Sequence, residues 1–402
     1  SPIAKWNSKT LRRRARPWTI WSKPTPTQRP HKQPKSAWHV QSKPLMDAAQ
    51  LATSTWVVLL CTLALSAVLG GVLRATHFCT MGAISDVVLM QDTTRLKQWA
   101  LAIAVAILGF GAMHWAGWID PQKSIYSAPH LLWLSSLVGG AIFGVGMVLG
   151  SGCTSKSLVR LGAGNLKSLV VLLVMAVVGL AALRGLLAVW RVNTLETFSL
   201  YAPDQAFVGS WWALQSGWSV PQASAAAALC IGGALLFWSL QGRSGASRSV
   251  LWGGAWVGLS VVAMWWITGV LGHGLEHPET LEEFFIATAS GRMESFSFTS
   301  PVAMVLDAFM YFSDGSKRLT VAMVSVFGVV LGSCLHALWT GSFRWESFAN
   351  RADLVRHLLG GALMGVGGVT AMGCTIGQGL SGVSTLSWMS VLTLISIGLG
   401  AW

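Results

Sequence analysis

Residues 139–154 read GGAIFGVGMVLGSGCT, and residues 360–375 read GGALMGVGGVTAMGCT. The two stretches align without a gap at a shift of 221 positions, and ten of the sixteen aligned residues are identical. Chance does not produce this agreement, so the chain contains a duplicated unit. Each copy carries a glycine-rich apolar run that ends in Gly-Cys-Thr. The same shift pairs Asp86 with Asp307.

The composition around the repeat is that of a membrane protein. Of the 402 residues, 53% are hydrophobic and 11% are charged, about half the charged share of a soluble domain. Apolar windows of roughly 20 residues recur, and each is long enough to cross the hydrocarbon core as a helix. We predict nine spanning helices, at about residues 54–73, 96–116, 131–149, 166–189, 222–241, 250–271, 319–338, 353–371 and 387–402.

Four shorter apolar segments lie between these windows and open at Cys-Thr or Ser-Pro. They are too short to span the bilayer and are typical of the half-helices found in transporters with broken helices. These segments are about residues 79–91, 153–163, 300–312 and 374–385. The predicted fold is therefore an all-α polytopic membrane protein with nine spanning helices and four half-helices.

The duplication divides a single transmembrane domain, residues 46–402. Repeat one covers about residues 54–189, repeat two about residues 250–402, and a linker helix at about 222–241 stands between them. Four spans plus the linker make an odd number, so the second unit is expected to enter the membrane upside down. The prediction is an inverted internal repeat.

The distribution of charged residues predicts the orientation of the chain in the membrane and distinguishes residues 1–45 from the rest. Residues 1–45 contain eleven Lys or Arg and no acidic residue, which indicates a disordered tail drawn to anionic lipid headgroups rather than to nucleic acid. The short loops favour an outside N-terminus and an inside C-terminus in a bacterial inner membrane, although the tail favours the reverse. The predicted inner basic residues are Arg74, Arg95, Lys97, Lys156, Arg160, Arg243, Arg248, Arg344 and Arg351, and the predicted outer acidic residues are Glu276, Glu279, Glu282 and Glu283.

The broken helices predict where a substrate passes, because irregular backbone is tolerated in a membrane only where it is buried in protein or lines a cavity. The half-helix starts at Cys153 and Cys374 present free N–H groups and the positive end of a helix dipole, which attract anions. Thr154 and Thr375 add hydroxyl donors. Ser300 takes the position of Cys79 in the second repeat.

Three of the six cysteines stand at half-helix starts: Cys79, Cys153 and Cys374. A thiol is a weak donor and a soft, polarizable contact, which suits a sulfur atom better than a hard oxyanion. The thiols are expected to stay protonated, because a thiolate would repel a dianion. Membrane cysteines are more often small packing residues, and we apply that interpretation to the other three, Cys61, Cys230 and Cys334.

Five charged or titratable residues near these starts are candidates for supporting roles. Asp86 and Asp307 are intramembrane carboxylates, which either couple a proton or bond backbone N–H groups and a neighbouring basic residue. Lys156 and Arg160 either steer anions or snorkel to the interface. His77 titrates near neutral pH but has no second His or carboxylate at ligand spacing, so we predict no metal site. The sequence has no GxxxxGK[ST] motif, and we expect no cofactor.

These motifs resemble the YeeE/YedE family of sulfur transport proteins, including its members that take up thiosulfate. The resemblance is carried by HFCTMGAISD at 77–86, GSGCTSKSLVRLGAGNLKSLV at 150–170, FTSPVAMVLD at 298–307 and MGCTIGQGLSG at 372–382. It implies an hourglass-shaped path along which three cysteines, matching Cys79, Cys153 and Cys374, pass thiosulfate by S–H contacts. It also implies a small cytoplasmic sulfur-carrier protein as partner.

Two features depart from the family pattern. The basic tail has no counterpart in the family core, and Lys156 stands where a glycine is common. The leading hypothesis is a thiosulfate permease that is not an enzyme. The alternatives are a sulfur-relay protein that forms a cysteine persulfide, and a transporter of another sulfur or selenium species.

Overall fold

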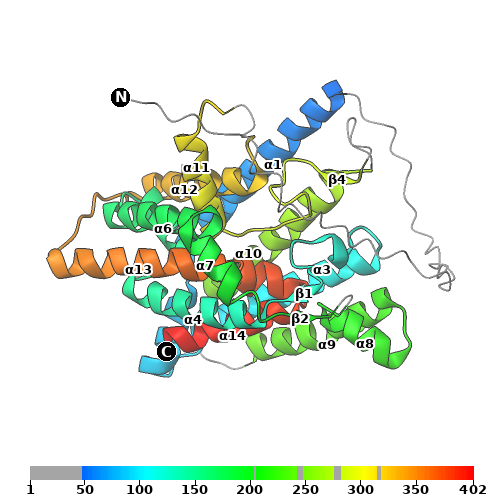
Figure 1. Cartoon of the computed structure of the whole chain (residues 1–402). Helices are drawn as coiled ribbons and strands as arrows, with labels where there is room; N and C mark the ends of the chain where they lie inside the picture. Colours follow the sequence, from blue (N-terminus) through cyan, green and yellow to red (C-terminus); the bar gives the residue numbers. More distant parts are fainter. Residues whose placement is uncertain (1–47, 203–204, 242–247, 276–281, 315–317) are drawn as a thin grey trace, which may run out of the picture. The chain divides into compact units, whose positions relative to one another are not determined.

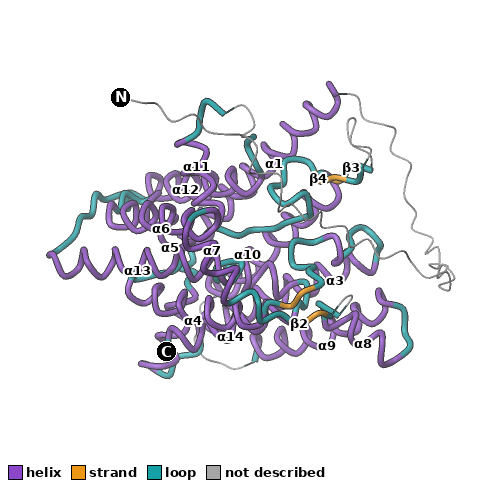
Figure 2. Tube along the Cα trace, in the orientation of Figure 1, coloured by secondary structure: helices purple, strands orange, loops and turns teal. Residues whose placement is uncertain are grey.

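The computed structural model of the chain describes residues 48–202, 205–241, 248–275, 282–314 and 318–402. The predicted basic tail, Arg243, Glu276 and Glu279 lie outside these residues. Helices make up most of the described chain, and the strands are only two residues long (Figure 2).

Helices occupy all nine predicted positions. They are α1 (Ala48–Ala75), α3 (Thr94–Trp115), α4 (Trp133–Leu149), α6 (Leu166–Arg184), α9 (Val220–Leu240), α10 (Arg248–Trp266), α12 (Val321–Trp339), α13 (Arg351–Thr370) and α14 (Trp388–Ala401). Seven helical segments of the described chain are long and apolar enough to cross a membrane. The other two are α14, which has 14 residues, and α13, whose first two turns carry three charged residues. The all-α polytopic prediction is confirmed.

The four short segments are also present. They are α2 (Thr80–Ser85) with the π-helical turn η1 (Asp86–Met90), α5 (Thr154–Gly162), α11 (Thr299–Met310) and the π-helical η4 (Gly377–Gly382). A further π-helical turn, η3 (Ile267–Leu271), extends α10. Each of the four short segments is separated from the preceding spanning helix by a turn or a loop.

Several elements differ from the sequence prediction. The span predicted at 166–189 ends at Arg184, because Gly185 adopts an extended conformation (φ −100°, ψ −157°) and separates α6 from α7 (Leu186–Thr194). The structure adds α8 (Val208–Ser216) and the 3-10 turn η2 (Pro121–Lys123). It also adds two antiparallel strand pairs: β1 (His130–Leu131) with β2 (Leu200–Tyr201), and β3 (His273–Gly274) with β4 (Phe284–Phe285).

The duplicated helices α4 and α13 pack against each other in antiparallel directions (Figure 1). A Cβ atom added at Gly146 would lie 2.9 Å from the carbonyl oxygen of Gly360, and one added at Gly367 would lie 2.8 Å from that of Gly139. The shift of 221 converts the first pair into the second. The two helices therefore meet through reciprocal contacts, and only glycine permits so close an approach of backbones.

The packing of the other helices also occurs in equivalent pairs, one pair for each direction of the repeat. Helix α1 packs chiefly on α12, and its counterpart α10 packs on α3; α6 packs on α13, and its counterpart α14 packs on α4. Helix α9 packs on α3 and α8. Each of these contacts between a helix of the first unit and a helix of the second therefore has a matching contact in which the two units change places.

Candidate functional site

Three cysteines follow the same kind of helix-ending turn. In each case a residue in the left-handed region stands two positions earlier: His77 (φ 51°), Ser151 (φ 57°) and Met372 (φ 57°). At Ser151 and Met372 the turns are closed by matching hydrogen bonds to the last carbonyls of α4 and α13, as in a Schellman motif. We call the cysteines that follow these turns the cap cysteines: Cys79, Cys153 and Cys374.

The sulfur atoms of the cap cysteines bond to the start of the next short segment. The Sγ of Cys79 accepts the Gly82 N–H at 3.4 Å, and the Sγ of Cys374 accepts the Gly377 N–H at 3.4 Å. The Sγ of Cys153, at the N-cap position of α5, lies 3.1 Å from the Ser155 hydroxyl oxygen. Because a thiol that accepts through sulfur still carries its own proton, the S–H groups of Cys79 and Cys374 keep a donor.

The cap cysteines lie near one another and are mostly buried. Cys153 and Cys374 are 1% and 0% exposed, and Cys79 is partly buried. Cys79 and Cys374 each lie within electrostatic range of Cys153. Cys153 is therefore the cap cysteine that lies within range of both others.

The remaining cysteines sit on spanning helices. Cys61 is on α1, Cys230 is exposed on α9, and Cys334 is on α12, where its backbone lies against Gly162 of α5. None of the three starts a helix.

The predicted hydroxyl donors differ in their surroundings. The Oγ1 of Thr154 lies 3.0 Å from the Oγ1 of Thr299 and donates to the Sδ of Met175 at 3.4 Å. The Oγ1 of Thr375 is buried and has no hydrogen-bond partner in the part of the chain that the structure describes. Ser300 is partly buried and lies inside α11 rather than at its cap.

Both predicted carboxylates form ion pairs. Asp86 Oδ2 lies 3.3 Å from Arg95 Nε, and Asp307 Oδ2 lies 3.2 Å from Arg184 NH1. These contacts agree with the alternative in which the carboxylates pair with neighbouring basic residues. His77 is exposed, and the described residues contain no group of three or more side chains able to hold a metal ion.

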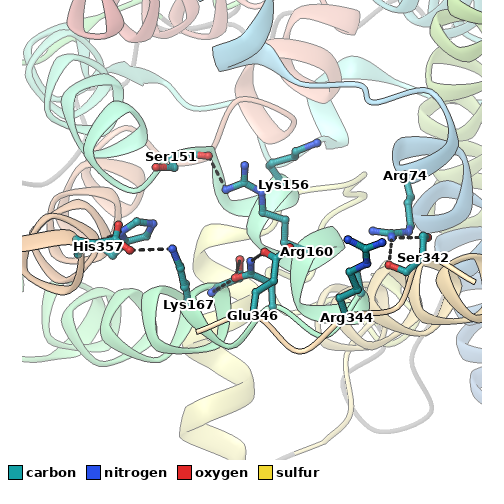
Figure 3. Close-up of a pocket in the computed structure, with 13 residues that line it drawn as sticks. Arg74, Ser151, Lys156, Arg160, Lys167, Ser342, Arg344, Glu346 and His357 are labelled. Atoms are coloured by element: carbon teal, nitrogen blue, oxygen red, sulfur yellow. Dashed lines mark hydrogen bonds and ion pairs between the residues drawn. The ribbon is translucent and has the colours of Figure 1, made fainter. Parts of the chain in front are cut away.

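A cavity of about 470 Å³ lies against Ser151 in the turn between α4 and α5 (Figure 3). It is lined by residues from the end of α1, from α5 and the turns on either side of it, from the start of α6, and from the loop between α12 and α13 together with the first turns of α13. We call it the basic cavity because its lining includes five cationic residues: Arg74, Lys156, Arg160, Lys167 and Arg344. Four of them are residues that the sequence predicted on the inner side. Sequence reasoning did not find the cavity, since Arg74 and Arg344 were noted there only as loop charges.

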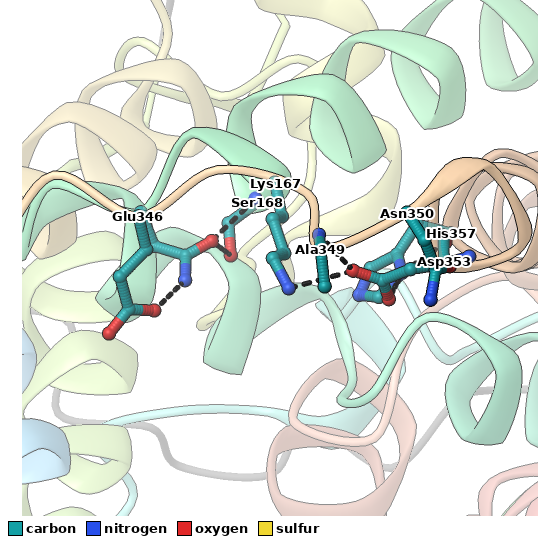
Figure 4. Close-up of polar contacts among 8 residues, drawn as sticks. Lys167, Ser168, Glu346, Ala349, Asn350, Asp353 and His357 are labelled. Carbon is teal, nitrogen blue, oxygen red and sulfur yellow. Dashed lines mark hydrogen bonds and ion pairs between the residues drawn. The ribbon is translucent and has the colours of Figure 1, made fainter.

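Polar contacts in the lining join the α5–α6 turn and the start of α6 to the segment before α13 and the first turns of α13 (Figure 4). Lys167 Nζ lies 2.8 Å from Asp353 Oδ2, and His357 Nδ1 lies 3.1 Å from Asp353 Oδ1. The side chain of Asn165 donates a hydrogen bond to Glu346. Both acidic residues of the basic cavity, Asp353 and Glu346, therefore bond to other residues of the cavity lining.

A second polar group lies on the predicted outer loops. Lys123 Nζ lies 2.5 Å from Glu283 Oε1, which also contacts His273. Although partial burial favours the neutral acid, these hydrogen bonds hold the pKa of Glu283 below its ordinary value. From the same loop as Lys123, the hydroxyl of Tyr126 donates to the carbonyl of Gly377, next to the Cys374 turn.

Residues 75–402 match the sequence model of the family described as "Sulphur transport". The chain belongs to this family. The match includes all three cap cysteines, and it confirms the resemblance drawn from the four quoted motifs.

Two curated relatives of this sulfur transport protein are similar to it over most of their length. "Thiosulfate transporter TsuA" from Escherichia coli K12 is 27% identical over 344 residues, which cover 84% of this chain and 90% of the relative. A protein of the same name from Spirochaeta thermophila is 26% identical over 353 residues, which cover 83% of this chain and 94% of the relative. With its spanning helices, the chain is a multi-pass membrane transporter rather than an enzyme.

Proposed function

We propose that the chain is a permease that imports thiosulfate across the bacterial inner membrane along a path that includes the cap cysteines. The observation that carries the proposal is that three buried or partly buried thiols each follow the same turn at the start of a short segment, with Cys153 within electrostatic range of the other two. The names of both relatives give thiosulfate as their cargo.

The chemistry of the cluster suits thiosulfate better than a plain oxyanion. S–H groups are weak, polarizable donors that match the outer sulfur of thiosulfate. The buried Thr375 hydroxyl, which has no partner among the described residues, supplies a harder donor for an oxygen atom. A site with both kinds of donor distinguishes the two ends of the anion.

Antiparallel packing of α4 and α13 supports an inverted repeat. If the second unit is upside down, the helices that lead to Cys153 and Cys374 enter from opposite faces and bring the two half-helix starts toward each other. The gathering of predicted inner residues around the basic cavity supports an outside N-terminus and an inside C-terminus.

The contacts of the cluster suggest an order for the path. Cys374 adjoins Gly377, which Tyr126 of an outer loop contacts, whereas Cys79 lies within electrostatic range of Lys156 in the basic cavity. We place Cys374 toward the outside, Cys153 in the middle and Cys79 toward the inside. A small cytoplasmic sulfur-carrier protein would then receive the anion on the cavity side.

Uptake of thiosulfate labelled at its outer sulfur tests the proposal. Cells that lack other importers are expected to accumulate label when they produce the chain, and unlabelled thiosulfate is expected to compete more strongly than sulfate. If the chain is present in the membrane and uptake equals that of cells without it, thiosulfate import is rejected.

A further inference from the structure

Four cations of the basic cavity have no acidic partner. Arg74 donates to the carbonyl and hydroxyl of Ser342 at 3.2 and 2.8 Å, and Arg160 donates to the carbonyl of Ser151 at 2.8 Å. The side chains of Lys156 and Arg344 make no hydrogen bond or ion pair with any residue that the structure describes (Figure 3).

The acidic residues of the lining do not neutralise this charge. Asp353 is paired with Lys167, and Glu346 accepts a hydrogen bond from the amide of Asn165 (Figure 4). With five Lys or Arg against two carboxylates, the lining carries a net charge of +3 when His357 is neutral. A concave site of one sign concentrates counter-ions of the other sign.

The donors of the cavity are chemically different from the cap cysteines. The donors of its lining are guanidinium, ammonium, imidazole, amide and hydroxyl groups, and the lining contains no thiol. Guanidinium groups bind planar pairs of oxygens in oxyanions, and an ammonium binds as a point charge. At about 470 Å³, the cavity holds many times the ~30 Å³ share of one water molecule, so a hydrated tetrahedral anion fits.

We propose that the basic cavity is a binding site for a tetrahedral oxyanion dianion, held by Lys156, Arg344, Arg74 and Arg160 and separate from the cap cysteines. It recognises charge and oxygen atoms, so sulfate, which lacks the outer sulfur of thiosulfate, is bound there as well. The inference extends the proposed function but does not depend on it, because no cysteine takes part.

Equilibrium binding of labelled sulfate to the purified full-length chain tests the inference. The wild type and a variant with all three cap cysteines changed to alanine are expected to bind sulfate with the same affinity. The double variant Lys156→Gln/Arg344→Gln is expected to bind about tenfold more weakly or worse, since it lacks both unpaired cations. Chloride at equal ionic strength is not expected to displace sulfate.

A matched control removes a charge outside the cavity. Lys97→Gln loses a cation on the same predicted side, whose Nζ donates to the carbonyl of Gln241, and it should leave sulfate binding unchanged. Thermal unfolding checks that the double variant is folded; if it is not, Arg344→Lys and Lys156→Gln are measured singly. Absence of saturable sulfate binding to the wild type, or equal binding by the double variant, overturns the inference.

The outcomes for the two proposals can be separated. Sulfate binding without thiosulfate uptake would reject the permease and leave the oxyanion site standing. Thiosulfate uptake without sulfate binding would reject the oxyanion site and leave the permease standing.

Discussion

The hydroxyl oxygens of Thr154 and Thr299 lie 3.0 Å apart and join the starts of α5 and α11. The repeat counterpart of Thr154 is Thr375, whose buried hydroxyl has no partner among the described residues. The two copies share a Cys-Thr sequence but use the threonine differently. One hydroxyl bonds to the protein, and the other keeps a donor beside Cys374.

The Thr375→Val variant is therefore expected to take up thiosulfate less well but to keep the stability of the folded protein. Valine has nearly the same shape and removes a buried hydroxyl that no described residue satisfies, so stability should be kept or raised. Loss of a donor to a substrate oxygen should raise the KM for thiosulfate uptake several-fold. Uptake kinetics and thermal unfolding of the same variant measure both effects.

Thr154→Val is the matched control and should behave in the opposite way. It leaves the Thr299 hydroxyl without its partner, which costs about 1 kcal/mol of stability, and it should change the KM less than Thr375→Val does. Equal effects of the two variants on the KM would show that the asymmetry has no role in binding.

The glycine contact between α4 and α13 predicts a large effect of one methyl group. A Cβ atom at Gly360 would lie 2.3 Å from the backbone nitrogen of Gly150, so Gly360→Ala must push the helices apart, at a cost of about 1–3 kcal/mol. Gly398→Ala on α14 is the control, because no atom lies within 4 Å of its added Cβ. Thermal unfolding in detergent should be lowered only by the first change, and equal midpoints would contradict the close packing.

Glu294 predicts a pH dependence of stability. It is 7% exposed in the loop before α11, and burial outweighs its hydrogen bond from the Ala289 N–H and raises its pKa to about 7. An acid whose folded pKa lies above its unfolded value, about 4.3, stabilises the fold at low pH and loses this contribution as pH rises toward 7. The loss is on the order of 3 kcal/mol.

Thermal unfolding of Glu294→Gln at about pH 5 and about pH 8 measures this contribution. The wild type should lose more stability between the two values than the variant, which has no titrating group at this position. The same pH slope in both proteins would mean that Glu294 does not titrate in this range.

The helix positions could be predicted because a bilayer requires about 20 apolar residues in helical form for each crossing. The break at Gly185 was missed, since a glycine inside an apolar run barely changes its hydropathy. Helix α8 was missed because nine residues are too few for a spanning window.

The candidate site could be predicted only in part. The repeated Gly-Cys-Thr sequence predicted that Cys153 and Cys374 lie at the starts of broken helices. The basic cavity could not be predicted, since Arg74 and Arg344 are brought together by contacts between helices far apart in the sequence. The difference between the two threonines depends on Thr299, which comes from the other repeat.

A permease and a persulfide relay respond differently to serine. In a permease, Cys153→Ser keeps a neutral donor and should retain part of the uptake that Cys153→Ala loses. A relay needs a nucleophilic thiolate, so both variants should be equally inactive. Intact-mass measurement after exposure to thiosulfate adds a second readout, in which a stable gain of one sulfur on a cap cysteine would favour the relay.

We propose that the cap cysteines lie on the transport path and that the other three cysteines do not. Initial rates of labelled thiosulfate uptake by the six single Cys→Ala variants, at matched protein levels, test it most directly. We predict that each cap-cysteine variant loses most of its uptake, while the variants of Cys61, Cys230 and Cys334 match the wild type. A Cys334 variant that fails to take up thiosulfate while the Cys374 variant transports normally would show that Cys374 is not on the path.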